Sequence, residues 1–136
     1  MAAPALSLTT LKGEVKKIGD YQGSGLIMIF MSSWCPCSND SIPIVKEAYM
    51  RQEGEGVKFL MIGIQEARSK FERFVDRRGI GFPAVYDSGK KISRAFGVNA
   101  PPTMVFIDAD GKVTRVFYGN IKDKEKEFAA WVKEIM

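Results

Sequence analysis

The chain of 136 residues contains no histidine. This absence excludes catalysis by Ser-His-Asp or Cys-His groups, and it removes the commonest zinc ligand. Chemistry must therefore come from thiols, carboxylates, amines or hydroxyls. Cysteine is also scarce, since the chain has only Cys35 and Cys37. A chain with 46% hydrophobic residues can build a core without disulfides, so these cysteines are not needed to hold the fold together.

Long apolar runs are absent as well. The longest, residues 26–31, is far too short to span a bilayer. The first residues lack a basic segment followed by an apolar one, so no signal peptide is visible. The net charge is +4, and the lysines and arginines are scattered among acidic residues. A charge so modest and unclustered does not favour binding to nucleic acid.

The hydrophobic pattern predicts a regular alternation of strands and helices. The expected elements are, in order, a hairpin (6–18), a strand (26–32), a helix (36–51), a strand (57–64), a helix (69–78), a short strand (82–87), a short helix (90–97), a hairpin (103–119) and a last helix with an apolar stripe. A helix between two buried strands implies that they pair in parallel, whereas the late hairpin adds antiparallel pairing. We expect one domain over residues 1–136, an α/β fold with a mixed central sheet and helices on both faces.

The two cysteines lie where a strand hands over to a helix. In "MSSWCPCSND", Ser32 and Ser33 end the strand, and Pro36 suits the first helical turn because its missing N–H is not needed there. Cys35 is therefore expected at the helix N-terminus, where free N–H groups and the helix dipole stabilise a thiolate. A thiolate is the form that acts as a nucleophile. Trp34 would cover one side of its sulfur.

This segment resembles the active-site segment of the thioredoxin superfamily, in the membrane-tethered or periplasmic group typified by TlpA, ResA and CcmG. That group has a strand, then W-C-x-x-C, then a proline inside the helix. Residues 8–23 resemble its opening hairpin, residues 79–98 its central insertion and residues 100–113 its cis-proline loop. The resemblance implies a thioredoxin-like three-layer α/β/α sandwich with the N-terminal β-hairpin as an extension.

The cysteine motif departs from that family pattern. The family's helix proline lies eight residues after the first cysteine, and Pro43 lies eight after Cys35, so no residue has been deleted. Cys37 takes the second x of C-x-x-C, and Ser38 stands where the resolving cysteine is expected. Helical residues i and i+2 point about 200° apart, so a disulfide between Cys35 and Cys37 would strain the first turn and be easily reduced. Either the pair is a more oxidising couple than C-x-x-C, or Cys35 works alone through mixed disulfides.

The resemblance also implies roles for residues around the cysteines. Pro102 matches the family's cis-proline, and Pro101 lies where relatives pair their backbone with the bound substrate. Proline at 101 supplies no N–H for that pairing. Trp34 and Pro36 complete the expected substrate-binding set. Glu66 matches a glutamate near the active site of the ResA-like group, and it is either a proton relay or a solvated acid at a strand end.

We therefore expect a thiol–disulfide oxidoreductase in which Cys35 exchanges disulfides with protein thiols and Cys37 is the candidate second thiol. The resemblance implies a periplasmic or membrane-tethered protein whose signal is missing from this sequence, engaged for example in cytochrome c maturation. The expected partners are protein thiols or disulfides and a redox partner protein, and the chain is expected to be a monomer without metal or cofactor. Two alternatives stay open: a Cu(I) carrier, since thiolates suit that soft ion, and a thiol peroxidase.

Overall fold

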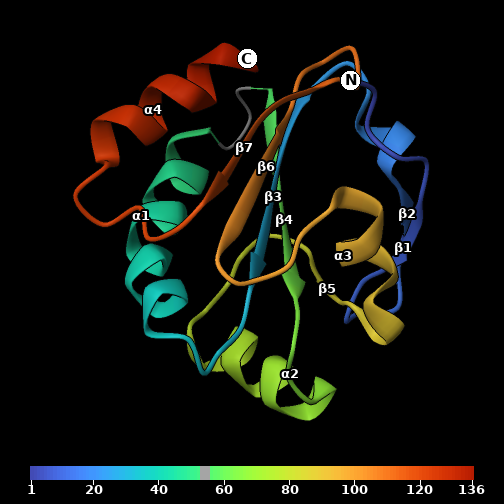
Figure 1. Ribbon diagram of the computed structural model, residues 1–136, viewed down its shortest axis with the longest axis vertical. Coiled ribbons are helices and arrows are strands. Elements are labelled where there is room, and N and C mark those ends of the chain that lie inside the picture. The colour runs from blue at the N-terminus through green and yellow to red at the C-terminus, as the bar shows by residue number, and fades with distance from the viewer. Residues whose placement is uncertain (53–55) are drawn as a thin grey trace.

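The centre of the computed structural model, which describes residues 1–52 and 56–136, is a five-stranded sheet in the order β5-β4-β3-β6-β7 (Figure 1). The strands are β3 (Gly25–Met31), β4 (Val57–Gly63), β5 (Ala84–Tyr86), β6 (Thr103–Ile107) and β7 (Val113–Tyr118). β3, β4 and β5 pair in parallel, whereas β6 runs antiparallel to β3 and β7 antiparallel to β6. The mixed sheet that the sequence pattern predicts is confirmed.

The burial of each strand follows its apolar pattern. Every residue of β3 is buried, as expected of a central strand whose two faces are both covered. β7 alternates between half-buried and exposed residues, because it lies at the edge of the sheet with one face open. β5 forms the other edge, and the N-terminal segment approaches it through a bridge between Thr10 and Val85.

Three helices share one hydrophobic cluster on one face of the sheet. They are α1 (Pro36–Gln52), α2 (Arg68–Arg77) and α4 (Glu125–Glu134), which contribute buried residues such as Val45, Phe71 and Phe128 to that cluster. Pro43 lies inside α1, and the helix continues past it to Gln52. Among the residues that the structure describes, no helix is both long and apolar enough to cross a membrane.

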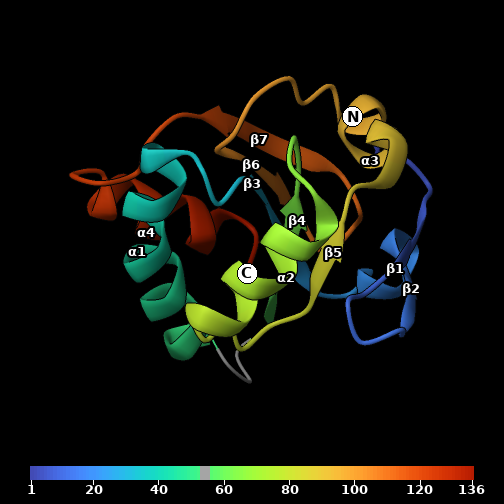
Figure 2. The same cartoon turned by 90° about the horizontal axis from the view of Figure 1, so that it is seen from below.

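The opposite face is covered by α3 (Lys91–Phe96) and by the N-terminal hairpin of β1 (Ser7–Thr9) and β2 (Val15–Lys17). Short 3-10 turns, η1 (Ile18–Tyr21) and η2 (Ser88–Lys90), follow β2 and precede α3. Figures 1 and 2 show α1 and α4 on one side of the sheet and α3 with the hairpin on the other. The expected α/β/α layers with a hairpin extension are therefore confirmed.

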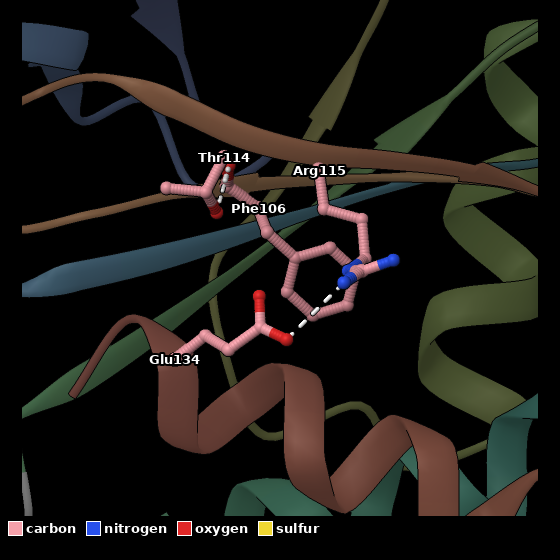
Figure 3. A network of polar contacts seen from close by, with 4 residues as sticks. All are labelled: Phe106, Thr114, Arg115 and Glu134. Atoms are coloured by element: carbon pink, nitrogen blue, oxygen red, sulfur yellow. Dashed lines mark hydrogen bonds and ion pairs between the residues drawn. The ribbon is translucent and has the colours of Figure 1, made fainter.

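Arg115 of the edge strand β7 contacts α4 (Figure 3). The guanidinium of Arg115 pairs with the Glu134 carboxylate at 3.1 Å, and its central carbon lies 4.9 Å from the centroid of the Trp131 ring. Beside it, the Thr114 hydroxyl donates to the Phe106 carbonyl at 3.4 Å. The apolar stripe predicted for the last helix thus meets the sheet, with Arg115 closing one side of the contact.

The topology brings three loops to the end of the sheet where β3 and β4 finish. β3 and β4 are parallel and in register, so Met31 and Gly63 end side by side. β6 runs antiparallel to β3 and therefore begins at that same end of the sheet. Cys35 follows β3, Glu66 follows β4, and the pair Pro101–Pro102 precedes β6. Residues that are distant in the sequence therefore meet at the strand ends, where ligands bind in open α/β sheets.

Gly63 tests how tightly this end of the sheet is packed. A Cβ added there would lie 2.4 Å from Cγ of Phe71 in α2, so the ring or the strand must shift. We expect Gly63→Ala to lower the free energy of unfolding by about 1–3 kcal/mol. Gly19→Ala is the control, because a Cβ at Gly19 would meet no described atom within 4 Å. Urea titration measures both variants, and equal midpoints for the two would contradict this account.

Candidate active site

Cys35 lies at the N-terminal end of α1, immediately before Pro36, the first helical residue. Its N–H donates to the Ser32 carbonyl at 3.2 Å, and its own carbonyl accepts the N–H of Asn39 at 3.1 Å. The second of these bonds is the first of the helix, so the ordered backbone of α1 begins at the cysteine. This is the placement that Pro36 predicts.

The two thiols have different surroundings. Cys35 is only 9% exposed, and its thiol donates to the Pro101 carbonyl across 3.8 Å. Cys37 is exposed, and both cysteines are free thiols. Two residues apart on the first turn of α1, one sulfur is directed into the protein and the other side chain lies at the surface, as the i, i+2 spacing predicts.

The loop before β6 forms the wall that Cys35 faces. The Pro101–Pro102 peptide bond is cis, and both prolines are buried. The N–H of Gly119 donates to the Pro102 carbonyl at 3.0 Å, which ties the loop to the end of β7. The Pro101 carbonyl accepts the Cys35 thiol, so the cis-proline loop and the start of α1 are in contact.

Ser38 stands where the resemblance places a resolving cysteine. It is fully buried, and its hydroxyl accepts the N–H of Ser32 at 3.4 Å. The hydroxyl of Ser32 in turn donates to the Ile64 carbonyl, which joins the ends of β3 and β4. The buried position one helical turn after Cys35 therefore holds a hydroxyl, while the second thiol of the chain lies at the surface.

Glu66 contacts the active-site loop through its whole carboxylate. One oxygen accepts the Ser33 N–H at 2.9 Å and the other accepts the Ser33 hydroxyl. The Tyr86 hydroxyl donates to the Glu66 carbonyl at 2.6 Å, so the backbone of this residue is held as well. Glu66 is half-buried and bonded, and it is not the freely solvated acid that was one of its two interpretations. Its partner is Ser33, two residues before Cys35.

Trp34 is anchored although it is 58% exposed. Its indole N–H donates to the Gln65 carbonyl at 3.0 Å, and the Gln65 side-chain amide donates to the Asn99 carbonyl at 2.8 Å. Pro36 is exposed, unlike the two prolines of the cis-proline loop. Of the four residues expected to bind substrate, Trp34 and Pro36 lie at the surface, whereas Pro101 and Pro102 are buried and Pro101 contacts Cys35.

Sequence reasoning missed Asn39 and Arg78. The Asn39 amide donates to the carbonyls of Ser33 at 2.9 Å and Cys35 at 3.0 Å, and its oxygen accepts an N–H of Arg78 at 2.8 Å. The Arg78 guanidinium also lies 5.7 Å from the centroid of the Phe74 ring. A cation at the end of α2 thus supports the active-site loop through Asn39. No local pattern indicates this, because Arg78 is 39 residues away in the sequence.

Comparison with known proteins agrees with this geometry. The family model described as Redoxin matches residues 1–132. The thiol-disulfide oxidoreductase ResA of Geobacillus thermodenitrificans is 32% identical over 124 residues, which cover 90% of this chain and 71% of that relative.

Solved structures share the fold. A structure from Chlorobium tepidum, assigned as the thiol:disulfide interchange protein DsbE, has a TM-score of 0.91 at 22% identity and covers 98% of this chain and 94% of its own. A secreted disulfide oxidoreductase of Mycobacterium tuberculosis has a TM-score of 0.83 at 23% identity, with 95% of each chain covered. At these identities the two structures establish the thioredoxin-like fold alone. The match over residues 1–132 and the identity to ResA show that the chain belongs to the Redoxin family.

Proposed function

We propose that this chain, as a thiol–disulfide oxidoreductase of the Redoxin family, exchanges disulfides with protein thiols through Cys35, with Cys37 as the second thiol. The observation that carries the proposal is the position of Cys35. Its sulfur lies at the start of α1 and contacts the carbonyl of Pro101 in the cis-proline loop. The thiolate is the form of a cysteine that attacks a disulfide.

The exchange takes two steps. The Cys35 thiolate attacks one sulfur of a substrate disulfide, so that a Cys35–substrate bond forms, the substrate S–S bond breaks and the released sulfur takes up a proton. Cys37, having lost its proton, then attacks the Cys35 sulfur, which forms a Cys35–Cys37 disulfide and releases the second substrate thiol. Two electrons pass to the substrate, and a redox partner protein restores the dithiol. The reverse sequence oxidises a substrate dithiol.

Cys37 is assigned the second step because Ser38 carries no thiol. A hydroxyl at the buried position cannot resolve a mixed disulfide, so the surface thiol must turn toward Cys35. The first turn of α1 has to deform for this, which favours the reduced pair. The couple is therefore expected to be more oxidising than the C-x-x-C of its relatives.

Substrate binding is assigned to the surface beside Cys35. Trp34 and Pro36 are exposed there and offer apolar contacts to a bound chain. The Pro102 carbonyl is already bonded to Gly119, and Pro101 has no N–H. A substrate backbone that reaches this loop can therefore use little besides the Pro101 carbonyl, which the Cys35 thiol would have to release.

We also place the chain outside the cytoplasm, as a monomer. Disulfides persist in oxidising compartments, and one structural neighbour is described as secreted. Substrates such as apocytochrome c belong to the same proposal. Recovery of the protein with cytoplasmic enzymes on cell fractionation, or as a dimer in sedimentation equilibrium, would contradict these two points.

The Cu(I) carrier and the thiol peroxidase are not favoured, since the relative that establishes the family is named a thiol-disulfide oxidoreductase.

A glutathione redox titration tests the dithiol step. Free thiols are trapped at each potential, and the intact mass is measured for the wild type and for Cys37→Ser. We expect the wild type to lose two hydrogens reversibly, and Cys37→Ser to accumulate a glutathione adduct on Cys35. If the wild type only gains glutathione on Cys35, the intramolecular couple is wrong, and Cys35 works alone.

The double variant Cys37→Ser, Ser38→Cys has the C-x-x-C spacing of the family pattern. Side chains at i and i+3 lie on the same side of a helix, so the disulfide of this double variant needs less deformation than Cys35–Cys37. We expect its midpoint potential to be lower than that of the wild type by about 30 mV or more, which corresponds to ~1.4 kcal/mol. Cys37→Ser alone is the control and should form no intramolecular disulfide. A potential equal to or above the wild type would refute the strain argument.

Glu66 is proposed as the proton relay, because its carboxylate contacts the loop that carries Cys35. Glu66→Gln should slow disulfide reduction by about tenfold or more and change its pH dependence, since acid–base groups contribute at least that much. The control is Glu127→Gln in α4, where the glutamate is exposed. Identical pH–rate profiles for the two variants would remove Glu66 from the mechanism and leave it a purely structural role at Ser33.

A further inference from the structure

Gln65 has a backbone conformation that is unusual for its residue type. Its φ is +57°, in the left-handed region, and only two other non-glycine residues of the described chain, Lys90 and Asp123, share a positive φ. Side chains with a Cβ are uncommon in this region, and they persist there when surrounding contacts hold them. The contacts of Gln65 therefore need an explanation.

Those contacts join two loops of the active site. The backbone carbonyl of Gln65 accepts the Trp34 indole N–H at 3.0 Å. Its side-chain amide donates to the Asn99 carbonyl at 2.8 Å. Trp34 belongs to the loop that carries Cys35, and Asn99 belongs to the cis-proline loop. One residue of a third loop, after β4, thus connects the other two.

These bonds complete a ring of contacts at Cys35. Trp34 is its neighbour in the chain and is bonded to Gln65, which is bonded to Asn99. Two residues after Asn99, the Pro101 carbonyl returns to the Cys35 thiol. Within this ring Cys35 is only 9% exposed, whereas Cys37 lies in the open. The Gln65–Asn99 bond is exposed, so water competes for both of its partners.

We propose that Gln65 is a positioning residue that latches the cis-proline loop to the active-site loop and thereby limits access to the Cys35 sulfur. When the Gln65–Asn99 bond opens, the loop before Pro101 loses a contact with the active-site loops while Pro102 stays bonded to Gly119, and the Cys35 thiol becomes easier to reach. Gln65 does not itself contact Cys35; it acts through Trp34 and Asn99. Loops at active sites open locally at low free-energy cost, so a single hydrogen bond is enough to change the open population.

Alkylation of the reduced, full-length chain by iodoacetamide measures that access. Mass spectrometry of the digested protein gives the rates at Cys35 and Cys37 separately, and the exposed Cys37 serves as the internal reference. Gln65→Gly suits the left-handed backbone and keeps the carbonyl for Trp34, but it removes the side chain. Gln65→Glu keeps the side-chain length, and its carboxylate cannot donate to the Asn99 carbonyl. We expect both variants to raise the Cys35-to-Cys37 rate ratio by about two- to tenfold, the effect of losing one hydrogen bond.

Gln22→Glu is the matched control, since Gln22 is exposed near the opposite end of the sheet and should leave the ratio unchanged. Thermal unfolding of each variant identifies a general loss of stability. An unchanged ratio in both Gln65 variants overturns the proposal. A rise in Gln65→Gly alone also overturns it, because backbone freedom would then be the cause. Equal acceleration at both cysteines does the same, because it reports loosening of the whole helix end.

The inference rests on the proposed function in one respect, that Cys35 is the reacting thiol. The two fail separately, because alkylation needs neither a substrate nor a redox partner. A chain that fails the glutathione titration would still show the altered rate ratio if the latch exists.

Discussion

The parallel pairing of β3 with β4 is the constraint on which the site depends. The two strands are in register over seven residues each, and nearly all of these side chains are buried. Because the strands end together, the backbone beyond each strand must turn at the same end of the sheet. A shift of one residue would reverse the direction of every side chain and disrupt the packing on both faces of the sheet. Glu66 reaches Ser33, two residues before Cys35, for this reason.

The polar groups of the active-site loop are satisfied largely by side chains from elsewhere. Glu66 binds the N–H and hydroxyl of Ser33, and Asn39 binds the carbonyls of Ser33 and Cys35. A loop at a strand end has no ladder to complete its hydrogen bonds, and unpaired buried groups are costly. These contacts therefore hold the backbone ahead of α1 in one shape, and Arg78 extends the support to α2. The result is a fixed backbone around Cys35, the proposed nucleophile.

The two cysteines of this chain differ in where their side chains lie. Ser38 fills the buried position one helical turn after Cys35, and Cys37 is exposed. The same helical geometry that places Cys35 against Pro101 turns Cys37 away from it. The two free thiols therefore have different surroundings, one against the cis-proline loop and one at the surface.

Much of the fold and part of the site follow from the sequence by itself. The apolar run before Ser32 determines a central strand, and Pro36 sets the start of α1. These are local properties, because strand burial and helix initiation depend on neighbouring residues. The opposed placement of Cys35 and Cys37 belongs to the same class, since it needs only the helical repeat.

Only the tertiary structure decided which groups meet. The partners Glu66–Ser33, Gln65–Asn99 and Pro101–Cys35 are 33, 34 and 66 residues apart. Nothing in a local pattern distinguishes Gln65 from any other polar residue after a strand. Its role arises because strand pairing brings the ends of three loops within hydrogen-bonding distance, and a side chain finds its partner only once that register exists.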